Sequence, residues 1–165
     1  MNNVLMDARP MPMLLVVALA TGWTLQGCGG ETESPLPRLV VEGSWARAMP
    51  LPPPASEAGA NSAVYMVLRN QSDTPDRLTG GETGAAAGVE VHESSMDGDV
   101  MRMRRVAGVE IPGRGEVELR PGGFHLMLLD LHHPLVEGSV LELTLEFEVS
   151  DDLVVEVPIR SHPPA

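Results

Sequence analysis

From Leu39 onward, the chain consists of short runs in which apolar and polar residues alternate, and no stretch shows the 3.6-residue apolar period of a helix of ordinary length. Successive side chains of a strand point to opposite faces, so this alternation predicts strands with one buried face. The clearest run is Leu141–Val149, with the sequence LELTLEFEV. Glycine, proline, asparagine and aspartate separate the runs, as they do at turns between strands.

These runs predict an all-β fold, an antiparallel β-sandwich of about eight or nine strands. Only Ala85–Gly88 is compatible with a single helical turn. Met49–Ala60 contains four prolines, which lack an amide donor and fix φ, so this segment is predicted to be a loop. It is either a rigid connector or a proline-rich recognition segment. The predicted strands are Leu39–Ala46, Ser62–Asn70, Asp76–Gly81, Val89–Met96, Val100–Arg105, Gly115–Leu119, Phe124–Leu129, Val140–Val149 and Val154–Arg160.

The composition excludes several classes of function. The 165 residues include 11 basic side chains, all of them arginine, against 23 acidic ones, and the formal net charge is −12. Binding to a phosphate backbone needs a basic face, so a nucleic acid is not an expected partner. The absence of lysine excludes Schiff-base and phosphate-loop lysine chemistry. No nucleophile-elbow serine, His-Glu-x-x-His motif or glycine-rich phosphate loop is present, so we expect no enzymatic activity.

Residues 1–27 are predicted to be a lipoprotein signal peptide. Arg9 precedes the apolar run Met11–Ala20, which is shorter than the about 20 residues that cross a bilayer as a helix and fits the core of a secretory signal. The sequence LQGC that ends at Cys28 resembles a bacterial lipobox, whose cysteine becomes acylated and N-terminal. The alternatives are an ordinary signal peptide with a chance cysteine, or a short buried helix.

The rest of the chain then divides into three parts. Residues 28–38 are the lipidated Cys28 and a polar, proline-bearing tether, residues 39–160 are a single domain, and residues 161–165 are a tail. Acylation of the only cysteine leaves no thiol in the mature protein. We expect the domain on the periplasmic face, in contact with the membrane through its lipid alone. In double-membraned bacteria, an aspartate directly after the lipidated cysteine usually opposes sorting to the outer membrane. This chain has Gly29 at that position, so we expect the outer membrane in such a bacterium.

A histidine and a methionine are brought together by a predicted hairpin. Asp97-Gly98 favours a type I′ turn, which needs positive φ at both central residues. With these two residues as the loop, His92 stands directly opposite Met103, and the Cβ atoms of such a pair are about 5 Å apart on one face. A shift of one residue would place the two side chains on opposite faces.

A second histidine–methionine pair lies on the predicted strand Phe124–Leu129. A spacing of two places His125 and Met127 on one face, with Leu126 and Leu128 directed toward the core. Uncharged thioether sulfur is a soft ligand that favours Cu(I), and the absence of a cysteine ligand excludes a blue-copper centre. Alternatively, these methionines fill the core of the sandwich, as methionines in strands commonly do.

Three other histidines are predicted to lie outside this site. His132 and His133 precede Pro134 and are expected at a solvated loop tip, with secondary metal binding as the alternative. His162 falls in the predicted tail. We assign it no role.

The spacing of four side chains resembles the motif of the PCuAC-type periplasmic copper chaperones, which is His, ten residues, Met, twenty-one residues, His-x-Met. His92, Met103, His125 and Met127 match every position. The resemblance extends over about residues 39–160 and implies a cupredoxin-like Greek-key sandwich with an exposed Cu(I) site and a role in assembling the copper site of cytochrome oxidase. Leu129 stands where family members often carry a further methionine. The loop from Met49 is long for the family, and it would bring Met49 near the site.

The leading hypothesis is therefore a lipid-anchored Cu(I) metallochaperone. The four side chains of the motif bind the ion near the surface, and a copper-accepting protein, such as a cytochrome oxidase copper subunit or another assembly factor, removes it by ligand exchange. Copper scavenging or storage would use the same site. A structural or adhesive lipoprotein without a metal role is the alternative from another class, and it predicts that the four side chains are buried or scattered.

Overall fold

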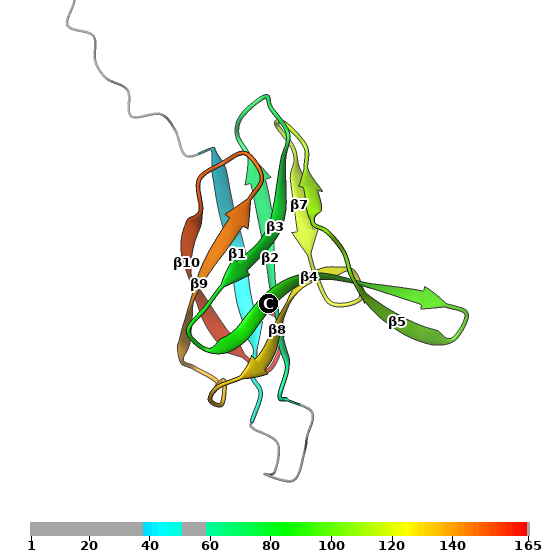
Figure 1. Ribbon diagram of the computed structural model, residues 1–165, viewed down its shortest axis with the longest axis vertical. Helices are drawn as coiled ribbons and strands as arrows, with labels where there is room; N and C mark the ends of the chain where they lie inside the picture. The colour runs from blue at the N-terminus through cyan, green and yellow to red at the C-terminus, as the bar shows by residue number, and fades with distance from the viewer. Residues whose placement is uncertain (1–37, 51–58, 165) are drawn as a thin grey trace, which may run out of the picture. The chain divides into compact units, whose positions relative to one another are not determined.

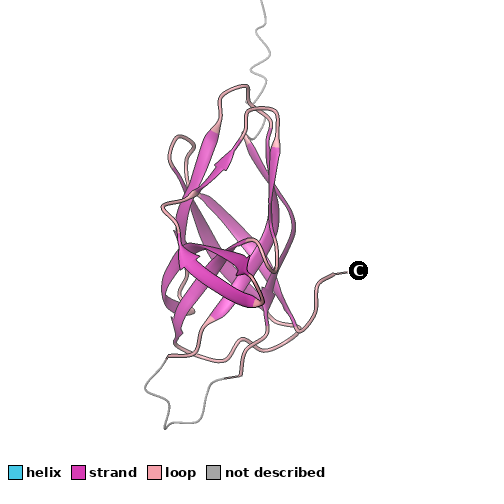
Figure 2. Cartoon of the chain, turned by 90° about the vertical axis from the view of Figure 1, so that its right-hand side faces the viewer, coloured by secondary structure: helices cyan, strands magenta, loops and turns pink. Residues whose placement is uncertain are grey.

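The computed structural model describes residues 38–50 and 59–164. The predicted signal peptide, Cys28, the tether up to residue 37 and the centre of the proline-rich loop lie outside the described residues. The described part is built from strands joined by turns and loops, and it contains no helix (Figure 2). Nowhere in residues 38–50 and 59–164 is there a helix long and apolar enough to cross a membrane. The predicted all-β fold is confirmed.

Every predicted strand is present, with ends that differ by a few residues. A strand that the sequence did not predict, Val109–Ile111, is only 3 residues long and lies between Gly108 and Pro112, so it is too short to show alternation. Ala85–Gly88 forms no helical turn, because strand β4 already begins at Ala86, which pairs with Leu131. The strands are β1 (Leu39–Arg47), β2 (Ser62–Asn70), β3 (Asp76–Glu82), β4 (Ala86–Asp97), β5 (Val100–Arg105), β6 (Val109–Ile111), β7 (Glu116–Leu119), β8 (Phe124–Leu131), β9 (Val140–Phe147) and β10 (Leu153–Arg160).

The strands form a sandwich whose two layers are hydrogen-bonded to each other along both edges. A closed ring runs through β4, β8, β2, β1, β10, β9 and β3, and β3 pairs back with β4. The pairing of β1 with β10 is parallel, whereas consecutive strands such as β1 and β2 pair antiparallel. Three strands extend the ring: β5 pairs with β4, β6 with β3, and β7 with β2. The β4–β5 hairpin therefore projects away from the ring (Figure 1).

Closure of the ring depends on Gly81 in β3. At this residue β3 pairs with both neighbours, with Val89 of β4 on one side and Leu145 of β9 on the other. A Cβ at Gly81 would lie 2.4 Å from the carbonyl oxygen of Thr144, so a larger residue would push β9 away. The same residue holds the first half of β4 against β3. It therefore also determines where the later residues of β4 lie.

The core is filled by leucine and valine side chains from the strands of the ring. Leu126 and Leu128 of β8 are fully buried, which confirms the prediction that they point into the core. Leu143 and Leu145 of β9 are equally buried. Met66 of β2 is 2% exposed, so this methionine does fill the core.

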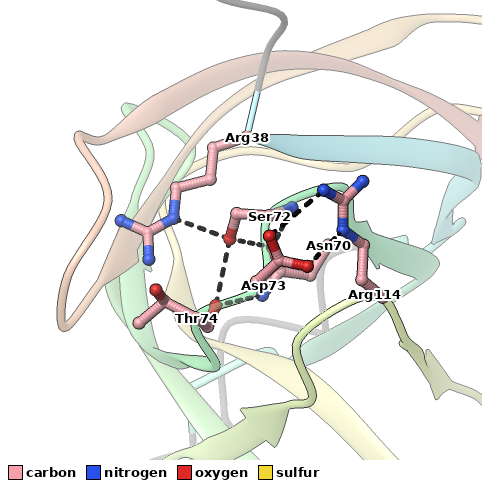
Figure 3. Close-up of polar contacts among 6 residues, drawn as sticks. All are labelled: Arg38, Asn70, Ser72, Asp73, Thr74 and Arg114. Carbon is pink, nitrogen blue, oxygen red and sulfur yellow. Dashed lines mark hydrogen bonds and ion pairs between the residues drawn. The ribbon is translucent and has the colours of Figure 1, made fainter.

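Polar side chains hold the end of the molecule where β1 begins (Figure 3). Nε of Arg38 donates to Oγ of Ser72 at 3.0 Å, and Oδ1 of Asn70 accepts from the backbone amide of Ser72 at 3.0 Å. Arg114, in the β6–β7 turn, contacts both carboxylate oxygens of Asp73 at 2.8 and 3.3 Å, and it lowers the pKa of that carboxyl. These contacts join three segments at the end of β2 that is farthest from the site described below.

Candidate metal centre

The four predicted ligands come from three neighbouring strands in the order β5, β4, β8. His92 lies on β4, Met103 on β5, and His125 and Met127 on β8. The last three line one pocket of about 460 Å³, and the His92 ring lies against that of His125. The structure therefore brings the four residues together on one face of the sheet.

The hairpin that carries Met103 has a different register from the predicted one. Its two-residue loop is Gly98-Asp99, so Met103 pairs with Ser94 and His92 pairs with Arg105. Gly98 has a φ of 64°, whereas Asp99 is not among the residues with positive φ. This pattern fits a type II′ turn, which needs glycine only at its first central position. In this turn, only the glycine has positive φ.

The new register differs from the prediction by two residues, and side chains of a strand repeat every two residues. Met103 therefore keeps the predicted face. It is now diagonal to His92, at a Cβ separation of about 7–8 Å instead of about 5 Å. A methionine has three rotatable side-chain bonds and spans such a distance easily.

The two imidazoles are cross-strand partners at the centre of the site. His92 pairs with His125 between β4 and β8, and their ring centroids are 6.0 Å apart. His125 is 2% exposed, and the His92 side chain is 15% exposed. Two histidines on one sheet face are thus both withdrawn from water.

Each ring has one nitrogen in a hydrogen bond and one without a partner. Nε2 of His92 donates to Oε2 of Glu90 at 3.0 Å, and Nδ1 of His125 donates to the carbonyl oxygen of Gly123 at 3.1 Å. These acceptors require that the two nitrogens carry the protons. Nδ1 of His92 and Nε2 of His125 are buried, and neither has a hydrogen-bond partner among residues 38–50 and 59–164. Buried polar atoms normally have a hydrogen-bond partner. Two ring nitrogens with free lone pairs in one site therefore favour a bound ligand.

The electrostatics keep the His125 ring neutral. Burial lowers the pKa of His125, the carbonyl of Gly123 opposes this shift, and the electrostatic effect of the neighbouring His92 ring lowers the pKa further. A neutral imidazole offers its lone pair without first losing a proton. The Nε2 lone pair of His125 is therefore available at neutral pH.

The thioethers occupy the solvent side of the site. Met103 is 50% exposed and Met127 is half-buried. Neither side chain fills the core in the way that Met66 does. Met49 and Met101 line the same pocket, so the prediction that Met49 approaches the site is confirmed.

Residues 39–159 match the family model described as "LpqE-like: Putative lipoprotein LpqE-like". The chain belongs to the LpqE-like lipoprotein family. A relative from Leifsonia xyli subsp. xyli, named "Putative lipoprotein Lxx21020", is 28% identical over 100 residues. That match covers 60% of this LpqE-like chain and 60% of the relative, so the chain spans about three fifths of the relative's length.

Solved structures similar to this LpqE-like chain are PCuAC domains. The structure titled "Copper-bound PCuAC domain from PmoF2" has a TM-score of 0.60 and 26% identity, over 76% of this chain and 94% of that one. The "Solution structure of CuI-DR1885 from Deinococcus Radiodurans" has a TM-score of 0.53 and 30% identity, over 73% and 78% of the two chains. The resemblance to PCuAC domains and the cupredoxin-like fold are thereby confirmed.

Sequence reasoning missed two contacts of the LpqE-like site. Oε1 of Glu90 lies 3.2 Å from Nη1 of Arg105, so this carboxylate is held between Arg105 and His92. Its position two residues before His92 in an alternating strand was the available signal. The Tyr65 ring lies 6.2 Å from that of His125 and stacks on Trp45 at 4.6 Å. No local signal predicts this stack, because Tyr65 and His125 lie on different, non-consecutive strands.

The other histidines of the LpqE-like chain lie away from the site, as predicted. His132 and His133 are exposed, and Nδ1 of His132 donates to the carbonyl oxygen of Gly84 at 3.2 Å. His162 is exposed as well. Among the described residues, no three His, Cys, Asp or Glu side chains are grouped in a way that could hold a metal ion.

Proposed function

We propose that this chain is a Cu(I) carrier that holds the ion through Nδ1 of His92, Nε2 of His125 and the sulfurs of Met103 and Met127. The observation that carries the proposal is that each of two cross-strand neighbouring imidazoles has a buried ring nitrogen with no partner in the described part of the chain. The copper-bound PCuAC domain among the similar structures supports the same cargo.

The donor set favours Cu(I) over other ions. Two imidazoles and two thioethers carry no charge, and thioether sulfur is too soft to compete well for zinc or iron(II). The set contains no carboxylate or thiolate, so none has to be reprotonated when the ion leaves. The net charge of −12 attracts cations over the whole surface.

The unequal exposure of the donors favours transfer. His125 is buried and the His92 side chain is only 15% exposed, whereas Met103 is 50% exposed. An incoming ligand of an acceptor protein would therefore replace Met103 first, while the imidazoles still hold the ion. We propose a copper-accepting protein of cytochrome oxidase assembly as the acceptor. Lipidation of Cys28 would anchor the carrier at the periplasmic face, in the outer membrane if the bacterium has two membranes. The proposed role requires no catalytic step.

The structural or adhesive alternative predicts that the four side chains are buried or scattered. His125 is indeed buried, but Met103 is 50% exposed. The four are not scattered, since three of them line one pocket and the fourth pairs with His125. The gathering of these residues therefore favours metal binding over packing.

The test is an anaerobic Cu(I) titration of the purified protein against a chromogenic Cu(I) competitor. We expect the wild type to withdraw one tightly held equivalent and the variant His92→Ala/Met103→Ala/His125→Ala/Met127→Ala to withdraw none, because all four donors are gone. The double variant His132→Ala/His133→Ala serves as the control, since it removes exposed imidazoles elsewhere, and it should bind as the wild type does. Equal binding by the wild type and the quadruple variant would overturn the proposal.

A further inference from the structure

Two more thioethers lie on the same face of the β4–β5 hairpin, beyond the proposed site. Met96 of β4 and Met101 of β5 are direct cross-strand partners next to the turn. Each is 62% exposed. The hairpin that carries them projects from the closed ring of strands (Figure 1), so this pair faces solvent at the outer end of the sheet.

Packing does not explain these methionines. All 6 residues of β5 are exposed, and an exposed edge strand usually carries charged side chains that protect it from aggregation. The opposite face of the hairpin follows this rule, with Arg102 paired to Asp97 and Arg104 paired to Glu93. One face is therefore covered by ion pairs and the other by thioethers, although both are open to water.

The geometry allows one ion to bridge the pair. Cβ atoms of directly opposed residues are about 5 Å apart, and the flexible side chains let both sulfurs turn toward a common point. Met103 follows Met101 by two residues on the same face, a step of about 7 Å along a strand. Met101 and Met103 also line the same pocket, so the outer pair is continuous with the proposed inner ligands.

We propose that Met96 and Met101 form a second, outer Cu(I) site, through which the ion passes on its way to or from Met103. This inference rests on the proposed function, since it takes the inner site as the destination of the ion. Two thioethers in water bind more weakly than two imidazoles and two thioethers in a half-buried site. The outer site therefore fills after the inner one and exchanges faster.

The test is an anaerobic titration with Cu(I) alone, followed by NMR of protein labelled with carbon-13 at its methionine methyl groups. We expect the first equivalent to shift the methyl signals of Met103 and Met127, and the second equivalent to shift those of Met96 and Met101. The buried Met66 is the internal reference and should not move.

The outcomes separate the two proposals. If the signals of Met103 and Met127 saturate while those of Met96 and Met101 stay in place, the outer site is overturned and the inner site stands. If only Met96 and Met101 respond, the outer site stands and the proposed inner site is wrong. If none of the four signals moves, both proposals are overturned.

Matched variants test the pairing itself. Met96→Leu/Met101→Leu removes both sulfurs but preserves the size and apolar character of the side chains, so we expect loss of the second step and retention of the first. Met96→Leu/Val100→Met keeps the number of exposed methionines but places one on the opposite face, because Val100 pairs with Asp97. The second step should stay absent. A second binding step in either variant would overturn the outer site.

Discussion

Glu90 is the residue that orients His92. Its Oε2 accepts the Nε2 proton at 3.0 Å, and its Oε1 is held by Arg105 at 3.2 Å. The hydrogen bond fixes the tautomer in which Nδ1 carries the lone pair. Partners of this kind commonly hold metal-binding histidines in both orientation and protonation state.

We predict that Glu90→Ala lowers the Cu(I) affinity by about 10- to 100-fold, the usual cost of losing such a partner. Glu90→Gln should retain most of the affinity, because its amide oxygen still accepts the Nε2 proton. Nitrogen-15 NMR of the apo protein should show a single His92 tautomer in the wild type and in Glu90→Gln, and a mixture in Glu90→Ala.

The control for this prediction is Glu93→Ala, which removes a nearby carboxylate on the opposite face of β4, where it pairs with Arg104. Its affinity for Cu(I) should equal that of the wild type. An unchanged affinity in Glu90→Ala would contradict the orienting role. An equal loss in Glu90→Gln and Glu90→Ala would show that the negative charge matters instead of the hydrogen bond.

At the scale of the elements, the β4–β5 hairpin sets the position of Met103, and Gly98 sets the register of the hairpin. Gly98 has a φ of 64°, and a Cβ there would meet nothing within 4 Å. A substitution therefore acts through backbone strain alone, at a cost of about 1–2 kcal/mol for an L-residue in a left-handed conformation.

We predict that Gly98→Ala increases local opening of the hairpin by about 5- to 30-fold, the factor that corresponds to this cost. Faster amide hydrogen exchange in β5 and weaker Cu(I) binding should accompany it, since both depend on the paired strand. The matched control is Gly88→Ala within β4, where a Cβ is also free of contacts and φ is not positive. Equal exchange rates in the two variants would contradict the role given to the turn.

At the scale of the whole molecule, Asp76 joins segments that are distant in sequence. Its buried carboxylate accepts hydrogen bonds from the backbone amides of Arg77, Val149 and Ser150 and from the hydroxyl of Ser150. It thereby ties the start of β3 to the β9–β10 connection. Burial alone would raise the pKa of Asp76, but the hydrogen bonds from Ser150, Arg77 and Val149 outweigh it and the pKa is lowered.

A lowered pKa in the folded state means that the ionised carboxylate stabilises the fold. This contribution is fully present above the ordinary aspartate pKa of about 3.9 and is lost as the pH falls through the lower pKa of the folded state. We predict that Asp76→Asn lowers the free energy of unfolding at pH 7 by about 1–3 kcal/mol, because an amide cannot satisfy all of these donors. In denaturant titrations the difference from the wild type should shrink as the pH is lowered below about 4.

Asp73→Asn is the control, because Asp73 has a lowered pKa as well but is exposed and, among the residues that the structure describes, pairs with Arg114 alone. Its free energy of unfolding should stay close to that of the wild type at both pH values. A deficit in Asp76→Asn that is the same at pH 7 and at acid pH would contradict the linkage to ionisation.

Much of the fold and the identity of the candidate ligands could be predicted from the sequence, because the signals are local. The alternation in Leu141–Val149 and the burial of Leu126 and Leu128 follow from the two-residue period of a strand. The same period places His125 and Met127 on one face. Val109–Ile111 escaped prediction because 3 residues are too few to show a period.

The assembly of the site was decided by the tertiary structure. His92 and His125 become partners only because β4 and β8 are neighbours, and the 32 residues between them along the chain carry no signal for that pairing. Even the register of the local hairpin differs by two residues from the prediction, because the turn forms at Gly98-Asp99, with positive φ at the glycine alone, and not at Asp97-Gly98. A strand's own sequence determines which face each side chain takes, whereas its neighbours in the sheet depend on how the whole chain buries its apolar faces.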